Sequence, residues 1–240
     1  MARGPVLTRA LLLAAGRGER LRPLTDTTPK PLLEVRGRAL IEHHVQRLAD
    51  AGIRELVVNL AWHGEQIRAR LGDGARHGVS IAYSDEGEAL ETAGGIVHAR
   101  ALLGDAPFAV VNADVWTDYP FKRLALPEGR LAHLVLVPNP VHNEGGDFTL
   151  DNGAVRNPGQ SRREGAAPTS AAPTLTFSGI AVYSPALFAT LAPGKRPLAP
   201  LLRAACDRGE VSGESFNGDW CDVGTPERLE RLRKNVGANL

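Results

Sequence analysis

The sequence predicts an α/β fold in which helices cover both faces of a mostly parallel sheet. Over most of the first 130 residues, short apolar runs with strand character alternate with helical patterns. Strands that alternate with helices favour a parallel sheet, because each helix carries the chain back across the sheet before the next strand begins. From about residue 131 onward, strand-rich segments are joined by turn signals. We therefore expect an antiparallel portion to follow the parallel one.

Each element of this fold has its own signal. The first predicted helix is the clearest, because its apolar residues share one face and Gly52 stands where it should stop. Thr225 is a good N-cap and Pro226 suits the first helical position, so a helix should begin there. The "DNG" at residues 151–153 favours a hairpin. The predicted strands are residues 10–14, 55–59, 79–83, 108–112, 131–137 and 175–183. The first predicted helix is residues 40–51, and those between it and the terminal helix are 65–71, 92–103 and 200–208.

Composition restricts the classes of partner. The 240 residues are 43% hydrophobic, enough for a sizeable core, and we expect residues 1–240 to form one domain. Lys and Arg number 28 against 27 Asp and Glu, so a net charge of +1 provides no basic field for nucleic acid or an anionic membrane. No stretch approaches the roughly 20 apolar residues of a membrane-spanning helix. The two cysteines lack metal-ligand spacing, which is typical of reduced thiols, so we expect a cytoplasmic protein.

One segment stands apart from these elements. Residues 156–173 contain almost no large apolar side chain, so they can form no core of their own and predict a loop. This loop carries Arg162 and Arg163. A lid over a binding site and a simple insertion are both compatible with its composition.

A glycine-rich, basic loop follows the first predicted strand. Gly16 and Gly18 allow the backbone to approach an anion closely, while Arg17, Arg20, Arg22 and Lys30 add positive charge around it. Two glycines alone would equally suit a tight turn. The spacing is not that of a P-loop, and a third glycine of the dinucleotide fingerprint is missing. The local charge and the position after a strand predict a polyphosphate site.

The whole stretch "LAAGRGERLRPLTDTTPKPLL" resembles the signature of the sugar-1-phosphate nucleotidyltransferases. This resemblance implies a Rossmann-like mixed sheet, the nucleotide-diphospho-sugar transferase fold. It also implies that the loop holds a nucleoside triphosphate, that Arg17 binds its phosphates and that Lys30 contacts phosphate oxygens during transfer. With Asp114, these two residues are the expected catalytic residues. The implied nucleotide-binding residues are Leu13, Ala14, Ala15, Gly16, Arg17, Gly18, Lys30, Glu86 and Asn112.

Two aspartates match the positions at which the family binds a metal. Asp114 ends the predicted strand "FAVVNAD", and Asp222 lies in "GDWCDVGT". Either residue alone would more often be an ordinary turn aspartate. The resemblance implies that together they bind Mg²⁺, which prefers one or two carboxylates with phosphate oxygens and water. Ala113 stands where the family usually has glycine.

The expected contacts to the second substrate come from three further motifs. Glu91 in "LETAGG" replaces the first glycine of the family's L-G-T-A-G-A segment and is a candidate for binding sugar hydroxyls. Gly146 and Asp147 in "GGDF" and Gly179 in "FSGI" match sugar-binding positions. The family's E-x-K-P motif is absent, because "RREGAAP" carries no lysine.

The resemblance covers residues 12–229 and is greatest to the N-acetylmuramate-1-phosphate uridylyltransferase branch, through "VNADVWTDY", "LAPLLR" and "VSGESFNGDWCDVGT". It implies small-molecule substrates, UTP and N-acetylmuramate 1-phosphate, which give UDP-N-acetylmuramate and pyrophosphate. About residues 8–130 would form the nucleotide-binding part, and about residues 131–240 the sugar-binding part and the C-terminal helix. The alternatives are another sugar-1-phosphate (glucose, mannose or N-acetylglucosamine) or choline-phosphate nucleotidyltransferase, and a non-catalytic nucleotide-sugar-binding regulatory relative. The sequence leaves a monomer and a homo-oligomer equally open.

Overall fold

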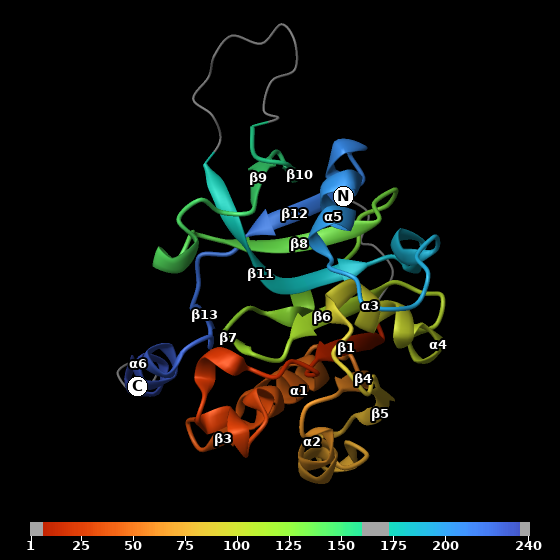
Figure 1. Cartoon of the computed structure of the whole chain (residues 1–240). Helices are drawn as coiled ribbons and strands as arrows, with labels where there is room; N and C mark the ends of the chain where they lie inside the picture. Colours follow the sequence, from red (N-terminus) through yellow and green to blue (C-terminus); the bar gives the residue numbers. More distant parts are fainter. Residues whose placement is uncertain (1–6, 160–172, 236–240) are drawn as a thin grey trace, which may run out of the picture.

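A nine-stranded mixed sheet forms the centre of the molecule in the computed structural model, which describes residues 7–159 and 173–235 (Figure 1). The strand order is β5-β4-β1-β6-β11-β8-β12-β10-β9. The first four strands in this order are parallel to one another, and the remainder of the sheet is mixed. This arrangement confirms the predicted fold class, including the change from parallel to antiparallel pairing.

The parallel half contains the strands that lead into the predicted nucleotide site. Strand β1 (Arg9–Leu13) lies between β4 (Glu55–Leu60) and β6 (Phe108–Asn112), and β5 (Ser80–Asp85) forms the edge. All four were predicted within two residues of their ends. Strands β1, β4 and β6 are buried on both faces and read as nearly continuous apolar runs, which is why they were recognisable, whereas the edge strand β5 is only partly buried.

The other half begins where β11 (Thr174–Tyr183) pairs antiparallel with β6. Beyond β11 lie β8 (Ala132–Val137), β12 (Val211–Ser215), β10 (Ala154–Arg156) and β9 (Phe148–Asp151). The predicted hairpin is present between β9 and β10, with both central turn residues, Asn152 and Gly153, at positive φ. Strand β12 was not predicted, because its single apolar position gives it no alternating pattern.

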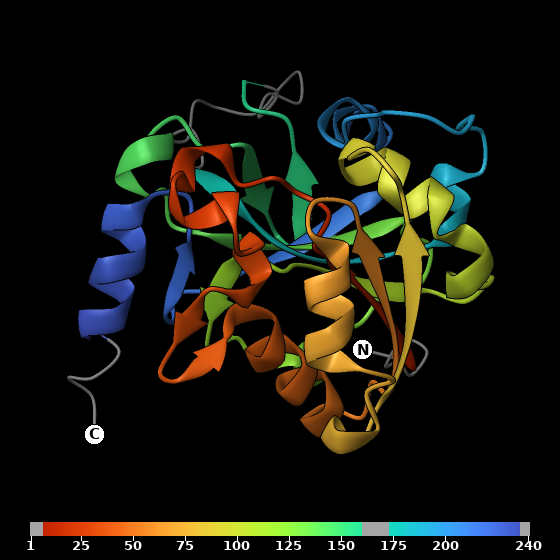
Figure 2. The same cartoon turned by 60° about the horizontal axis from the view of Figure 1, so that its bottom comes forward.

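Helices cover both faces, as expected. On one face, α1 (Leu40–Asp50) and α2 (Gly64–Leu71) pack against the side chains of Ala10 and Leu12. On the other, α3 (Glu91–His98), α4 (Arg100–Leu103) and α5 (Ala199–Asp207) pack around Leu11. Figures 1 and 2 show these two groups on opposite sides of the sheet. Residues 92–103 were predicted as one helix but form two, because the chain breaks at Ala99.

A third cluster of buried side chains packs the C-terminal helix against segments from the first half of the chain. Helix α6 (Pro226–Asn235) packs with the loop after β1 around Leu21, Trp116 and Leu229. The Thr225 hydroxyl accepts a hydrogen bond from Arg228 N at 3.3 Å, so the predicted N-cap is present. Two short ribbons were not predicted, β2 (Glu34–Val35) with β3 (Arg38–Ala39), and β7 (Val115–Thr117) with β13 (Trp220–Asp222). Among the described residues, no helix is long and apolar enough to cross a membrane.

Burial of His44 predicts a pH dependence of folding. Its ring is buried, its Nε2 lies 2.7 Å from Val115 O, and burial lowers its pKa from 6.5 to about 4. Between these values the unfolded chain binds a proton that the folded chain does not, so stability should fall by about 2 kcal/mol from pH 7 to pH 5. Urea unfolding at both pH values checks this. The loss should be smaller in His44→Gln, whose side chain keeps a donor but does not titrate; an equal loss would assign it to other groups.

Candidate active site

An open cleft of about 470 Å³ lies where β1, β4 and β6 end. Parallel sheets of this type bind ligands at the carboxyl ends of their strands. Eight of the nine predicted nucleotide-binding residues line this cleft or its floor; Arg17 is the exception. The lining residues are Leu13, Ala14, Ala15, Gly16, Gly18, Glu19, Arg20, Lys30, Pro31, Asn59, Glu86, Ala89, Glu91, Thr92, Asn112, Asp114 and Gly224.

The loop after β1 is held in shape by its own residues. Gly18 has φ 70°, a conformation that side chains disfavour, and a Cβ there would lie 3.1 Å from Thr25 and 3.2 Å from Lys30. The Thr25 hydroxyl donates a hydrogen bond to Gly18 O at 2.9 Å. The requirement for glycine at Gly18 is therefore both conformational and steric, and it keeps the loop close against Lys30.

A buried polar network, which the sequence analysis did not identify, connects three strands beneath the cleft. Asn59, at the end of β4, accepts a hydrogen bond from Ala14 N at 2.6 Å and donates one to Glu86 at 2.6 Å. Glu86 also accepts from Leu90 N at 2.8 Å. Asn59 thus positions both the start of the loop after β1 and Glu86. The sequence contained a signal for Asn59, because this polar residue ends the apolar run "LVVN" in the same way that Asn112 ends "AVVN".

Lys30 and Asp114 form an ion pair on the wall of the cleft. The Lys30 side chain is only 10% exposed, whereas that of Asp114 is 37% exposed. The ammonium donates directly to the Asp114 carboxylate. The structure therefore brings together two of the predicted catalytic residues, which are 84 positions apart in the chain.

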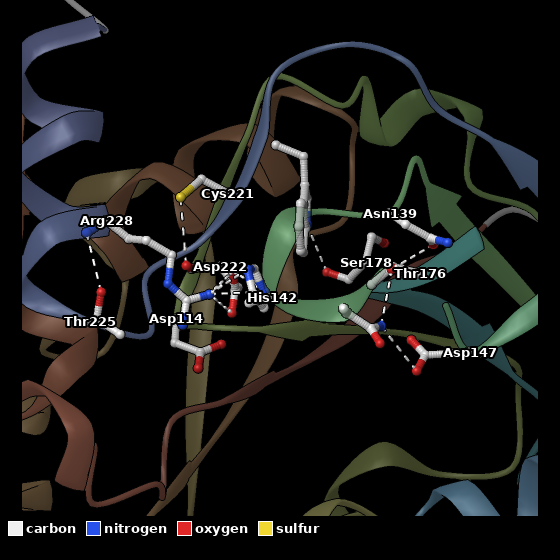
Figure 3. Close-up of polar contacts among 12 residues, drawn as sticks. Asp114, Asn139, His142, Asp147, Thr176, Ser178, Cys221, Asp222, Thr225 and Arg228 are labelled. Atoms are coloured by element: carbon white, nitrogen blue, oxygen red, sulfur yellow. Dashed lines mark hydrogen bonds and ion pairs between the residues drawn. The ribbon is translucent and has the colours of Figure 1, made fainter. Parts of the chain in front are cut away.

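Asp222 lies next to Asp114 in the structure because β13 pairs with β7. Asp222 is in register with Val115, and Val223 N donates to Asp114 O at 2.9 Å. Figure 3 shows its carboxylate turned toward Arg228 and His142. The Arg228 guanidinium donates to both Asp222 oxygens at 2.5 Å, and His142 Nε2 lies 3.1 Å from one of them.

The donor chemistry at these aspartates fits magnesium. Two carboxylates on adjacent strands are oxygen ligands of the type and number that Mg²⁺ uses beside phosphates. Each is paired with a cation here, Asp114 with Lys30 and Asp222 with Arg228. Among the described residues, no group of three or more His, Cys, Asp or Glu side chains gathers as a complete metal cage. An ion bound there would compete with both cations for these carboxylates, and substrate phosphates are suitable new partners for the cations.

The arginines of the loop occupy different positions from one another. The Arg17 guanidinium stacks on Trp62, with 3.6 Å from Cζ to the ring centroid, and lies 3.5 Å from Asp26. Arg17 is not among the residues that line the cleft, so a phosphate contact would require it to leave Trp62. Arg20 does line the cleft. Among the residues that line the cleft, Arg20 and Lys30 are the cations.

A second cleft of about 450 Å³ adjoins the first and shares Glu91, Thr92 and Asn112 with it. Of the predicted substrate-binding residues, Glu91 and Asp147 line it. Its remaining lining residues, none of which was a predicted site residue, are Phe148, Phe177, Pro197, Leu198, Ala199, Leu202 and Arg203. The two clefts together provide adjoining spaces for two substrates.

The predicted glycines act at the edges of this second cleft. Gly179 has φ 80°, and a Cβ there would lie 2.6 Å from the Asn112 side chain, so this glycine leaves room for a residue that lines both clefts. Gly146 packs against Asn139 and Thr174 and is not a lining residue. Gly146 therefore shapes the turn before Asp147, and a direct contact between Gly146 and the sugar stays a prediction. Arg162 and Arg163 lie outside the described residues.

Glu91 has φ 60°, the left-handed conformation, where the family motif has glycine. This conformation costs an L residue about 1 kcal/mol, which offsets the entropy that glycine would lose on folding. Glu91→Gly should therefore change the free energy of unfolding by less than about 1 kcal/mol. If the carboxylate binds sugar hydroxyls, kcat/KM for the sugar phosphate should fall roughly tenfold.

Glu91→Gln separates the two effects, because it removes the charge and keeps a side chain at this φ. Urea unfolding and steady-state kinetics of both variants test the prediction. Full activity in Glu91→Gly would rule out a sugar contact, and a larger loss of stability would rule out the backbone argument.

Comparison with known proteins agrees with this geometry. Residues 9–143 match the family model described as nucleotidyl transferase. The chain is 48% identical to N-acetylmuramate alpha-1-phosphate uridylyltransferase of Neisseria meningitidis, covering 96% of this chain and 99% of that protein, and 34% identical to the Caulobacter vibrioides enzyme of the same name, covering 91% and 92%.

The fold also has a close match among solved structures. A putative glucose-1-phosphate thymidylyltransferase from Bacillus anthracis superposes with a TM-score of 0.80 over 97% of this chain and 96% of that one, at 21% sequence identity. At that identity the likeness concerns the fold alone. Because the family model covers more than half of the chain and these relatives span almost all of it, the chain belongs to the nucleotidyl transferase family.

Proposed function

We propose that this protein transfers a uridylyl group from UTP to N-acetylmuramate 1-phosphate, giving UDP-N-acetylmuramate and pyrophosphate. The observation that carries the proposal is the 48% identity, over nearly the full length of both chains, to an enzyme named for this reaction. The predicted phosphate loop, Lys30 and Asp114 line one cleft, and a second cleft adjoins it. Such an enzyme would return N-acetylmuramate to cell-wall synthesis as part of peptidoglycan recycling.

In this proposal the two substrates meet at the boundary between the clefts. The triphosphate of UTP lies along the loop after β1, where backbone N–H groups and Arg20 face it. The sugar lies in the second cleft, so that an oxygen of its phosphate attacks the α-phosphorus of UTP in line and pyrophosphate departs. Lys30 balances the charge that grows on the phosphoryl oxygens, and Glu86 and Asn112 orient the substrates. Arg17 joins the triphosphate after leaving Trp62.

We propose Asp114 and Asp222 as the residues that hold Mg²⁺. When bound, the ion would neutralise charge on the α-phosphate and pyrophosphate. The Lys30 ammonium and the Arg228 guanidinium pair with these carboxylates. Both cations are directed at the site from different elements, and each could then turn to phosphate.

We also propose that the chain acts as one unit in the cytoplasm. One nine-stranded sheet contains strands from both the nucleotide-binding part and the sugar-binding part, which supports a single catalytic domain. The two cysteines, Cys206 and Cys221, are both free thiols, as in a reducing compartment. UTP is available in that compartment.

The proposal is tested by measuring pyrophosphate release over a grid of nucleoside triphosphates and phosphorylated acceptors. The grid contains UTP, CTP, GTP, ATP and dTTP against the 1-phosphates of N-acetylmuramate, N-acetylglucosamine, glucose and mannose, with choline phosphate. The highest kcat/KM is expected for UTP with N-acetylmuramate 1-phosphate. A different preferred pair would identify another nucleotidyltransferase, and binding without turnover of any pair would identify a regulatory relative.

A further inference from the structure

The second cleft must accommodate a negative charge if the proposed function is correct, on which this inference rests. N-acetylmuramate differs from N-acetylglucosamine by a lactyl ether that ends in a carboxylate. With the sugar phosphate beside Lys30, the pyranose would extend past Glu91 and Thr92, which line both clefts, into the second one. Burying a carboxylate there without a partner would be costly, so a cation should face it.

The charged side chains that line the second cleft differ in the hydrogen-bond and ionic partners that they already have. The Asp147 carboxylate accepts from Phe177 N at 2.8 Å and from Asn143 Nδ2 at 3.3 Å, so its role is to hold β11. The Glu91 carboxylate lies 4.0 Å from the Lys195 ammonium. Both are anions and would repel a lactyl carboxylate.

Arg203 is the cation among the lining residues of this cleft. Its Cζ lies 5.5 Å from the centroid of the Phe148 ring, which forms part of the same wall. Within residues 7–159 and 173–235, its guanidinium forms no ion pair or hydrogen bond, in contrast to the paired Lys30 and Arg228. It therefore presents all of its donors to a ligand.

The backbone of Arg203 is held firmly although its side chain is exposed. It lies on α5, which Leu202 and Ala205 anchor in the core. The Asn157 side chain donates to both Arg203 O at 3.0 Å and Asp207 at 2.6 Å, tying the helix to the segment after β10. A guanidinium on a fixed helix beside an apolar wall suits recognition of a carboxylate through two parallel hydrogen bonds.

We propose that Arg203 binds the lactyl carboxylate and thereby selects N-acetylmuramate 1-phosphate over N-acetylglucosamine 1-phosphate. The apolar wall of Phe148, Phe177 and Leu198 lies around the same position and accommodates the methyl groups of the lactyl and acetamido substituents. Removing the guanidinium should therefore affect one sugar and not the other.

The test compares kcat/KM for the two sugar 1-phosphates, with UTP saturating, in four proteins: the wild type, Arg203→Met, Arg203→Lys and Arg208→Met. Methionine keeps an unbranched stem against Phe148 but removes every donor. Lysine restores the charge without the planar fork. Arg208, the residue that follows the last residue of the same helix, pairs with Glu210 and does not line the cleft, which makes it a matched control.

Arg203→Met is expected to lower kcat/KM for N-acetylmuramate 1-phosphate roughly tenfold or more, while the value for N-acetylglucosamine 1-phosphate stays within about twofold. Arg203→Lys should recover part of the loss, and Arg208→Met should resemble the wild type with both sugars. An equal loss for both sugars in Arg203→Met, or no loss, would overturn the proposal. Failure of the wild type to use N-acetylmuramate 1-phosphate would instead overturn the proposed function, so the two failures are distinguishable.

Discussion

Replacing Asp114 with asparagine is expected to lower kcat by about three orders of magnitude. A carboxylate that places a divalent cation on a transferring phosphoryl group contributes several kcal/mol to lowering the barrier, and each 1.4 kcal/mol is about tenfold in rate. The side chain of asparagine has the same shape but no charge, so the loss would come from the charge itself. Steady-state pyrophosphate release at saturating UTP and increasing Mg²⁺ measures it.

Asp114→Asn also removes the ionic partner of the nearly buried Lys30, so stability has to be measured beside activity. Thermal unfolding and UTP binding should show that the variant is folded and binds nucleotide. Asp118→Asn is the matched control, since the same charge is lost from an exposed aspartate four positions further on. Near wild-type turnover of Asp114→Asn at high Mg²⁺ would show that Asp114 does not hold the metal.

Lys30→Met is expected to lower kcat by about two orders of magnitude with little change in KM for UTP. The ammonium is almost buried, where an electrostatic contact to the growing charge on the phosphoryl oxygens is strong. Removing one preorganised donor to such a charge typically costs about 10²- to 10³-fold in kcat. Methionine fills a similar volume, so the loop around Gly18 should keep its shape.

The division between kcat and KM decides the role of Lys30. An interaction made in the ground state and the transition state alike would raise KM and leave kcat unchanged. That outcome would reassign Lys30 to nucleotide binding. Lys122→Met, which removes an exposed lysine from a short helical turn, should leave both parameters unchanged.

Much of the fold was predictable because local patterns specify it. The strands around β1 are buried on both faces and therefore read as continuous apolar runs, and α1 shows an apolar stripe ended by Gly52. The turn at residues 151–153 and the Thr225 cap depend on only a few neighbouring residues. Strand β12 and the two short ribbons have no such local signal, because long-range pairing stabilises them.

The sequence by itself predicted which residues carry the chemistry, namely the glycine-rich loop, Lys30, Asp114 and Asp222, and it placed the site at the ends of the parallel strands. Only the tertiary structure decided which of these groups contact one another. The β7–β13 ribbon brings Asp222 beside Asp114, and Arg228 then neutralises it. The packing of distant segments likewise places Asn59 under the loop after β1 and Arg203 in the wall of the second cleft. The physical reason is that spacing along a chain fixes contacts only within a helix, a strand or a turn, whereas contacts between distant segments depend on how the whole core packs.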